Sequence, residues 1–473
     1  MKTMKKLLAV ILSMTLFMAM GICASASSQG GGDGDGTNAA PKGSITVTNA
    51  IVGETYTLYK VFNATVANGR ADEGTGISYT STWFTKQMAA TCKYFDVDDS
   101  GNITIKPEGK KDSGELSDGA IAWLKDQKTS NFTQIGQPVE ATSTTVKWED
   151  LDPGYYYIDT TTGSFVTVDS ITPNVNVEDK NSLPSHDKKQ ATAADGTFGD
   201  DLLELNIGDT VYYQTEIKIG KGSDKPITLT DTMTSGLDLN QTTITVKKGS
   251  ETVPASNYDL TPSEHGFTLV LKADYVKTLS ETDVVTVAYS AVINSSAAID
   301  SATGNSNEAK LEYSQQTATD TVYVATYDFQ LFKTDGSAEH TYLPGATFKL
   351  YDALSEGNLI PVGKDDTGYY LDSTKDVEIE VTSADGVNVR GLKPGTYYLE
   401  EIHAPSGYNK LTERKPVTIT SKQDKPHEVY VENHAGAELP NTGGRGTTLL
   451  YAIGAALVIG AAVLLIARRR TEQ

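Results

Sequence analysis

The C-terminal end of the chain carries the feature that most constrains the fold. Residues 447–467 form an uninterrupted apolar run, and Arg468, Arg469 and Arg470 follow at once. A run of this length is sufficient for a helix that crosses the hydrocarbon core of a bilayer. Because positive charge stays on the cytoplasmic side, the C-terminus is predicted inside the cell and all preceding residues outside. Whatever precedes this helix must therefore fold and remain stable outside the cell.

The N-terminal end of the chain predicts export. Residues 1–26 combine a basic start, an apolar run and a small-residue cleavage site, which together are typical of a secretory signal peptide cut before Ser27. Residues 27–42 are rich in Gly, Asp and Ser without apolar periodicity. We expect these residues to form a flexible lead.

The composition excludes several classes of function. Lys and Arg number 40 against 61 Asp and Glu, a formal charge of −21, and no basic stripe occurs between the two ends, so nucleic acid is not an expected partner. Cys23 and Cys92 are the only cysteines, too few for a disulfide framework. The six histidines lie in no nucleophile or metal motif, so we expect neither a conventional hydrolase nor a metal or other cofactor.

Between its two ends the chain is predicted to be mainly β. The 24 tyrosines and the recurrent Thr and Val favour half-buried strands. Short alternating segments are separated by turn residues, with one expected helix near residues 119–128. This pattern predicts tandem β-sandwiches of immunoglobulin-like architecture. The expected domains are residues 43–182, 183–325 and 326–436.

One segment of the first domain is similar to the start of a calcium-binding loop. Asp96, Asp98 and Asn102 have suitable spacing, but Pro107 stands where such a loop needs a bidentate Glu. Asp, Gly and Asn are also ordinary turn formers. The sequence therefore favours a polar hairpin turn here.

The third domain places polar residues on apolar strand faces. Lys333 shares its parity with three large apolar residues on the first strand. Glu401 shares its parity with two apolar residues on a later strand, and Asn433 with two valines on the last strand. Unpaired burial of each side chain would cost several kcal/mol. We therefore expect the three side chains to meet.

A short motif precedes the C-terminal apolar run. Leu439-Pro440-Asn441-Thr442-Gly443, the apolar span and the Arg cluster resemble the sorting signal of Gram-positive surface proteins, here residues 437–473. The resemblance implies that a sortase cuts between Thr442 and Gly443 and transfers the Thr acyl group to an amine. An extended peptide that contains Pro suits entry into an enzyme groove.

Residues 397–408 closely resemble the E-box of Gram-positive pilins, with Ile402 where the family usually has Thr. The third domain is thus similar to a collagen-adhesin B-type domain. The resemblance implies an intramolecular isopeptide bond between Lys333 and Asn433, with Glu401 as proton shuttle. Burial lowers the pKa of an amine and raises that of a carboxyl group, which suits both roles. The alternative is a buried Lys333–Glu401 ion pair beside a hydrogen-bonded Asn433.

The second domain is similar to the second domains of backbone pilins, which make an equivalent bond. The resemblance assigns Lys188 and Asn307 as the bonded pair and Asp231 as the acid. Lys189 and Asn305 remain open alternatives, because the register of a short strand is uncertain by one residue and both Asn residues share a face. Exposed turn residues are the alternative to any bond here.

The first domain closes with Lys180-Asn181, where backbone pilins carry their linking lysine, usually within Tyr-Pro-Lys-Asn. Here Glu178 and Asp179 replace Tyr-Pro. The resemblance implies Lys180 as the intersubunit linkage, against the alternative of an ordinary surface lysine.

The whole chain thus resembles the major shaft subunit of a covalent Gram-positive pilus. The resemblance implies a structural protein rather than an enzyme, held in the cell wall after a membrane-bound precursor stage. The implied partners are a pilin sortase, a housekeeping sortase, other copies of the chain, peptidoglycan, and tip and base pilins. The alternative function is a wall-anchored adhesin that binds a host or matrix ligand and is never polymerised.

Overall fold

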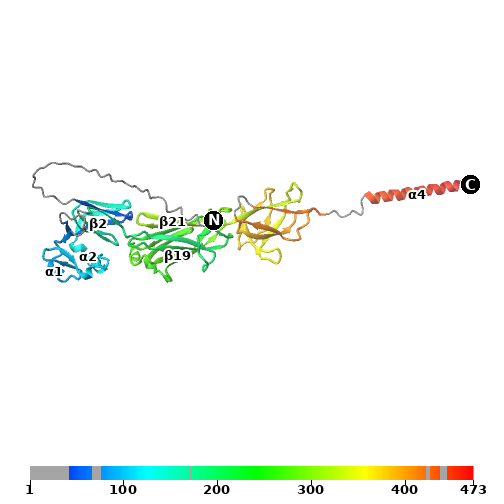
Figure 1. The fold of residues 1–473 in the computed structure, drawn as a ribbon. Coiled ribbons are helices and arrows are strands. Elements are labelled where there is room, and N and C mark those ends of the chain that lie inside the picture. Colours follow the sequence, from blue (N-terminus) through cyan, green and yellow to red (C-terminus); the bar gives the residue numbers. More distant parts are fainter. Residues whose placement is uncertain (1–41, 67–75, 170–171, 422–426, 437–444, 472–473) are drawn as a thin grey trace, which may run out of the picture. The chain divides into compact units, whose positions relative to one another are not determined.

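The computed structural model describes residues 42–66, 76–169, 172–421, 427–436 and 445–471 (Figure 1). The predicted signal peptide, residues 27–41 of the predicted lead and the motif 439–443 lie outside the described residues. The described chain is mainly β and forms three β-sandwiches followed by a C-terminal helix, as the sequence predicts.

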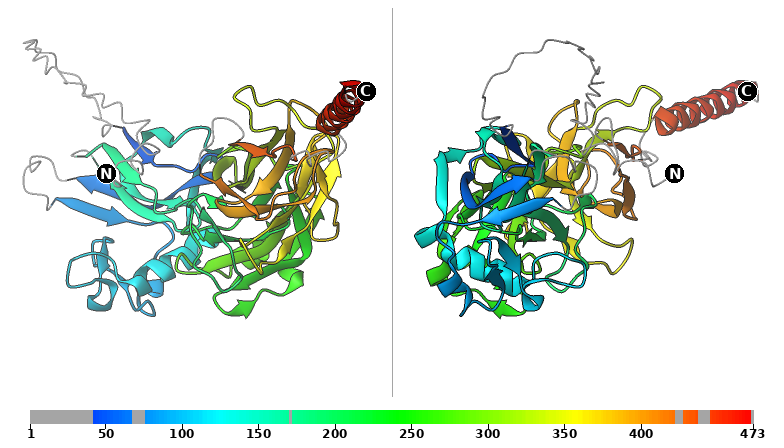
Figure 2. Two further views of the ribbon diagram at one scale, coloured as in Figure 1. Left: turned by 90° about the vertical axis from the view of Figure 1, so that its right-hand side faces the viewer. Right: turned by 60° about the vertical axis from the view of Figure 1, so that its left-hand side comes forward.

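The first sandwich packs a three-stranded sheet against a five-stranded sheet (blue to cyan in Figures 1 and 2). The first sheet has the order β10 (Asn174–Glu178), β1 (Gly43–Thr48) and β7 (Thr145–Leu151), with β1 and β10 parallel. The second has the order β3 (Ile77–Thr80), β2 (Thr55–Val66), β8 (Gly154–Asp159) and β9 (Ser164–Val168), and β6 (Thr133–Glu140) also pairs with β2. Alternating apolar residues of both sheets form the core between them.

A mixed segment covers part of the second sheet of this sandwich. It contains α1 (Lys86–Ala89), β4 (Phe95–Val97), β5 (Ile103–Ile105), η1 (Pro107–Gly109) and α2 (Asp118–Asn131). The Ser117 hydroxyl accepts from the backbone N–H of Ala120 and so caps α2, which confirms the helix expected near residues 119–128. The turn between β4 and β5 is the expected polar hairpin, because Asp98 accepts from the N–H groups of Ser100 and Asn102.

The second sandwich has a five-stranded and a six-stranded sheet. The first has the order β11 (Ser185–Ala191), β13 (Thr210–Lys218), β19 (Val284–Ile293), β15 (Leu237–Lys248) and β16 (Glu251–Thr252). The second has the order β12 (Leu203–Glu204), β21 (Gln316–Ala325), β20 (Asn305–Tyr313), β14 (Ile227–Met233), β18 (Gly266–Leu271) and β17 (Tyr258–Ser263). Two short helices, η2 (Ala255–Asn257) and α3 (Ala273–Val276), lie in the connections. Strict alternation of buried and partly exposed residues, clearest along β13, directs one face of each strand inward.

The third sandwich also has two sheets. The first has the order β25 (Val362–Asp365), β26 (Gly368–Leu371), β28 (Val387–Leu392), β22 (Tyr327–Thr334) and β31 (His427–Glu432). The second has the order β24 (Leu359–Ile360), β23 (Thr347–Tyr351), β29 (Gly395–His403) and β30 (Lys415–Ile419), and β27 (Ile379–Glu380) also pairs with β23. The first and last strands of this sandwich, β22 and β31, are parallel neighbours, and Lys333 lies opposite Val431.

The C-terminal helix α4 (Arg445–Thr471) contains an apolar stretch, Leu449–Arg470, that is long enough to cross a membrane, with a mean hydropathy of 2.7. Three arginines occupy its last turn. The helix predicted over 447–467 is therefore confirmed.

Candidate functional site

The third sandwich brings the three predicted polar side chains into its core. Lys333 on β22, Glu401 on β29 and Asn433, directly after β31, are each 1% exposed. Their neighbours of the same parity are buried apolar residues, because each strand turns one face toward the core. All three side chains point into one core, but of the three only Glu401 and Asn433 are joined to each other by hydrogen bonds.

Within this cluster the carboxylate contacts the amide. The Asn433 Nδ2 atom donates to both Glu401 carboxylate oxygens, at 2.9 and 3.0 Å, and Glu401 also accepts from the backbone N–H of Leu411 at 2.8 Å. The Lys333 Nζ atom donates to the carbonyl oxygens of Thr334 and Val431, at 3.1 and 3.0 Å. The amine is thus held beside the last strand, two residues before Asn433, and the Asn433 Oδ1 atom is buried without a hydrogen-bond partner.

Burial makes the Lys333 amine easier to deprotonate. Removal from water lowers the pKa of Lys333 from 10.5 to about 8, although the negative charge of Glu401 opposes this shift. A substantial fraction of a lysine with this pKa is neutral near physiological pH. A neutral amine and a side-chain amide in one buried core, with a carboxylate on the amide nitrogen, are the reactants and the proton carrier for amide exchange.

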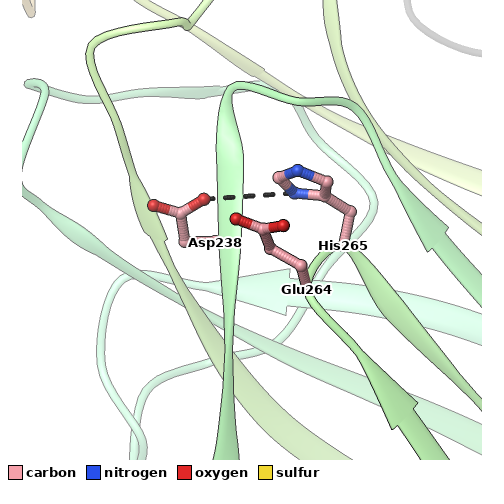
Figure 3. A group of neighbouring side chains, drawn as sticks. All are labelled: Asp238, Glu264 and His265. Atoms are coloured by element: carbon pink, nitrogen blue, oxygen red, sulfur yellow. Dashed lines mark ion pairs between the residues drawn. The ribbon is translucent and has the colours of Figure 1, made fainter.

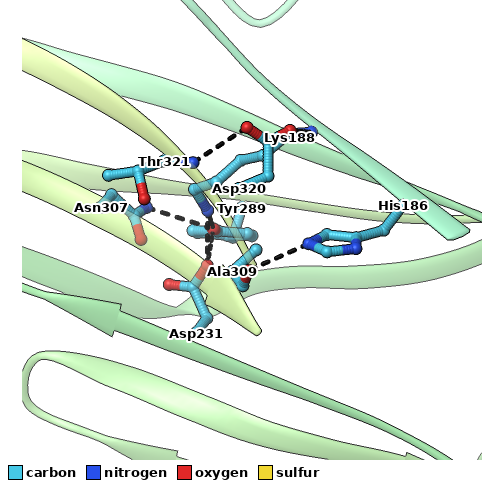
Figure 4. A network of polar contacts seen from close by, with 8 residues as sticks. All are labelled: His186, Lys188, Asp231, Tyr289, Asn307, Ala309, Asp320 and Thr321. Atoms are coloured by element: carbon cyan, nitrogen blue, oxygen red, sulfur yellow. Dashed lines mark hydrogen bonds and ion pairs between the residues drawn. The ribbon is translucent and has the colours of Figure 1, made fainter. Parts of the chain in front are cut away.

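The second sandwich contains a similar cluster (Figure 4). Lys188 on β11, Asp231 on β14 and Asn307 on β20 are at most 2% exposed. Here the carboxylate contacts the amine, because Lys188 Nζ donates to Asp231 Oδ2 at 2.6 Å. The network reaches Asn307 through Tyr289 on β19, whose hydroxyl accepts from Asn307 Nδ2 at 3.2 Å and donates to Asp231.

Aromatic rings enclose this second amine. The Lys188 Nζ atom lies 5.3 Å from the ring centroid of Tyr213 and 5.2 Å from that of Tyr289, and it also donates to the Tyr289 hydroxyl oxygen. Burial lowers the pKa of Lys188, against the opposing charge of Asp231. Burial, together with the Asp231 charge, raises the pKa of Tyr289 well above its ordinary value, so its hydroxyl keeps its proton.

The structure separates the alternatives that the sequence leaves open in this sandwich. Lys189, one residue along β11, has a side chain that is 26% exposed and forms ion pairs with Asp187 and Glu216. Asn305 is buried but exchanges two hydrogen bonds with the backbone of Ala298. These ion pairs of Lys189 and these hydrogen bonds of Asn305 do not connect either residue to Lys188, Asp231 or Asn307.

Sequence reasoning missed Tyr289. It lies on the inward face of a predicted strand, among buried valines and alanines, and its pattern is that of an ordinary core aromatic residue. The available signal was its hydroxyl, because a buried tyrosine hydroxyl usually requires a hydrogen-bond partner. A tyrosine hydroxyl on the apolar face of that strand therefore indicates that other buried polar groups lie nearby.

The predicted linking residue, Lys180, is exposed and follows β10. It lines an open groove of about 580 Å³ together with Lys125 and Lys221. Lys180 does not belong to either buried cluster, and the Thr442 to which it is predicted to be joined lies outside the described residues.

Within the described residues, one group of side chains has the spacing of metal ligands, namely Asp238, Glu264 and His265 (Figure 3). Both carboxylates are exposed. The His265 Nδ1 atom is 2.9 Å from the carbonyl oxygen of Leu237, which can only accept a hydrogen bond, so this nitrogen carries a proton. With this proton in place Nδ1 offers no lone pair to a metal, and it lies 4.0 Å from the carboxylate of Asp238.

Comparison with protein families finds three matches along the chain. Residues 207–317 match the Gram-positive pilin backbone subunit 2, Cna-B-like domain. Residues 327–435 match the prealbumin-like fold domain SpaA, and residues 431–472 match the LPXTG cell wall anchor motif.

Individual proteins are also similar. The trypsin-resistant surface T6 protein of Streptococcus pyogenes serotype M6 is 24% identical in an alignment 386 residues long, with 62% of this chain and 70% of that protein covered. Among solved structures, the T6 backbone pilin of S. pyogenes is 18% identical, with 81% of each chain covered and a TM-score of 0.47. The full-length RrgB pilus protein of Streptococcus pneumoniae is 16% identical, with 85% of this chain and 99% of that chain covered and a TM-score of 0.46. With a pilin backbone domain, a prealbumin-like domain and a cell-wall anchor motif in one polypeptide, the chain is homologous to the backbone pilins of Gram-positive bacteria.

Proposed function

We propose that this protein is the shaft subunit of a covalent cell-surface pilus, polymerised by sortase through linkage of Thr442 in one copy to Lys180 in the next. The observation that carries the proposal is the order of matches along the chain, with a pilin backbone domain and a prealbumin-like domain followed directly by an LPXTG anchor. The α4 helix then holds the precursor in the membrane until the sortase acts, with the arginines inside.

The linkage conserves atoms without an added reactant. The sortase thiolate attacks the Thr442 carbonyl carbon, the bond to Gly443 breaks and a thioester forms. The Lys180 amine then attacks this thioester, an amide forms and the thiol is released. The exposure of Lys180 supports this assignment, because the amine must reach the active site of another protein. A housekeeping sortase joins the finished polymer to an amine of peptidoglycan by the same exchange, and tip and base pilins complete the proposed partners.

We propose further that each buried cluster forms an intramolecular isopeptide bond. The neutral Lys333 amine attacks the Asn433 side-chain carbonyl carbon, the new amide forms and the Asn nitrogen leaves as ammonia. Glu401 carries the proton from the amine to the leaving nitrogen, which it already contacts. Lys188, Asn307 and Asp231 take the same roles in the second sandwich. The chain is thus a sortase substrate that reacts once with itself and has no turnover.

Immunoblots of cell-wall extracts in denaturing gels test the proposed polymer. Cells carry the native chain, Lys180→Ala, or Lys221→Ala as a matched control, since Lys221 is exposed and lines the same groove. We expect a ladder of polymers in the native and control strains and monomer in Lys180→Ala. A ladder in all three strains would move the linkage to another lysine. Monomer in all three would support a wall-anchored adhesin that is not polymerised.

A further inference from the structure

The chain is held on both sides of the exposed Lys180. On the N-terminal side, the backbone N–H of Asp179 donates to the carbonyl oxygen of Thr48 on β1, at 2.9 Å. On the C-terminal side, the N–H of Ser182 donates to the carbonyl oxygen of Lys221 at 3.0 Å, and the N–H of Lys221 donates to the Ser182 hydroxyl at 2.8 Å. The backbone around Lys180 is therefore fixed while its side chain is exposed to solvent.

The Asp179 side chain connects this segment to the core of the first sandwich. One carboxylate oxygen accepts from the Tyr56 hydroxyl, and the other accepts from the backbone N–H of Asn181 at 3.1 Å. Together these contacts bridge the residues on either side of Lys180.

Tyr56 is a rigid anchor for that carboxylate. Its side chain is fully buried among the core residues between the two sheets, and its hydroxyl also accepts from the backbone N–H of Ile51 at 2.9 Å. Burial and the contact with Asp179 raise the pKa of the Tyr56 hydroxyl, so it stays protonated and donates to the carboxylate.

The geometry points to Asp179 and Tyr56 as positioning residues that present the Lys180 amine to the sortase-bound acyl group, a role that rests on the proposed function. A nucleophile whose backbone is already ordered loses less conformational entropy when it enters another protein's active site. Asp179 supplies this order through its two hydrogen bonds. The Lys180 side chain keeps the freedom to reach the thioester.

The test compares variants in cells that express the full chain and its sortase. Tyr56→Phe removes the hydroxyl, and Asp179→Ala removes the carboxylate. Asp179→Asn is the conservative variant, because its side-chain oxygen can still accept from the Asn181 N–H while its NH₂ group donates to the Tyr56 hydroxyl oxygen. Tyr156→Phe is the matched control, because Tyr156 is 1% exposed in the same sandwich and its hydroxyl donates to the Asp152 carbonyl oxygen, outside the Lys180 segment.

The measured quantities are the rate at which pulse-labelled monomer enters polymer, the amount of the Lys180–Thr442 branched peptide, and the thermal midpoint of the monomer. We expect Tyr56→Phe and Asp179→Ala to slow linkage about tenfold, the scale set by ordering one residue of backbone. Asp179→Asn should restore most of the native rate. Tyr156→Phe should lower the thermal midpoint as much as Tyr56→Phe does, with no change in the linkage rate.

Two results would overturn the positioning role. One is a native linkage rate in Tyr56→Phe and Asp179→Ala. The other is an equal slowing in these two variants and in Tyr156→Phe, which would mean that only overall stability matters. Failure of the proposed function has a different signature, namely that the native chain yields no Lys180–Thr442 branched peptide. In that case the positioning role falls with it.

Discussion

The second and third sandwiches bury the same three kinds of side chain but connect them differently. In the third, Glu401 contacts the amide of Asn433 and the amine of Lys333 contacts backbone carbonyl oxygens. In the second, Asp231 contacts the amine of Lys188, and a tyrosine stands between the carboxylate and Asn307.

In the proposed bond formation, this difference would set the path of the proton. Aspartate is one methylene shorter than glutamate, and the Tyr289 hydroxyl extends the reach of Asp231 toward the amide nitrogen. In the third sandwich the longer Glu401 needs no relay. The comparison teaches that the same three kinds of residue can be brought together in two ways, with the longer acid in direct contact with the amide in one sandwich and the shorter acid connected to it through a tyrosine in the other.

Removal of either asparagine should have the largest effect, and an equal one in both sandwiches. The intact mass of the full chain, purified from sortase-deficient cells, should be lower than the sequence mass by two ammonias. The masses of Asn307→Ala and Asn433→Ala should each be lower than their own sequence mass by only one ammonia. Each variant should lose about 5 kcal/mol of unfolding free energy, because a cross-link that closes a long loop restricts the unfolded chain. An unchanged native mass would contradict both proposed bonds.

The pH dependence of stability should appear only when a bond is absent. In Asn433→Ala the Lys333 amine remains free, with a pKa of about 8 in the fold against 10.5 ordinarily. Between these values the unfolded chain binds a proton that the folded chain does not, so the unfolding free energy should rise with pH across that window, by roughly 3 kcal/mol. Denaturant titrations from pH 7 to 10.5 measure this rise.

The control for that titration is the double variant Lys333→Met with Asn433→Ala, which has no amine and should show no rise. Asn307→Ala should show a rise of the same sign, since burial also lowers the pKa of Lys188. A flat profile for Asn433→Ala would indicate that the buried amine stays protonated and is a poor nucleophile.

Tyr289→Phe is the variant that should separate the two sandwiches. Without the hydroxyl, proton transfer between Asp231 and Asn307 loses its relay, and formation of the second bond should slow by about a hundredfold. The third bond should form at its native rate. Tyr213→Phe is the control, because Tyr213 packs its ring against Lys188 in the same way. Intact mass at intervals after pulse labelling reports both bonds, and equal slowing in the two variants would exclude a relay.

Lys189→Met should have the smallest effect. Its ion pairs with Asp187 and Glu216 are partly exposed, and such pairs contribute about 0–1 kcal/mol. The intact mass should still lack two ammonias. If the mass of Lys189→Met shows the loss of only one ammonia, the bond of the second sandwich is made by Lys189 and not by the buried Lys188.

The sequence predicted the third cluster because its strands alternate strictly. On β22 a run of large apolar residues precedes Lys333 at the same parity, so the buried face was defined before the lysine was reached. Glu401 and Asn433 follow apolar residues in the same way. The alternation of side chains along each strand was therefore sufficient to predict that Lys333, Glu401 and Asn433 point into the core.

The second cluster was harder to predict because β11 has a polar sequence. Lys188 and Lys189 point to opposite faces, and no apolar pattern along Ser185–Ala191 fixes which face is inward. The register comes from pairing with β13, which places Lys188 opposite the buried Thr215. Tyr289 was missed because its partners, Asp231 and Asn307, come from the facing sheet, and their contact is a tertiary property.

The parallel pairing of β22 with β31 has a mechanical consequence. When the chain is pulled from its two ends, two parallel neighbours that are the first and last strands of a sandwich must slide past each other, so the six residue pairs along them resist together instead of separating one by one. With Lys333 joined to Asn433, tension would cross from the end of β22 directly to the residue after β31. Residues 334–432 would then carry no load and could not be drawn out. A filament built from such subunits would behave as a cord with a nearly fixed length rather than as a spring.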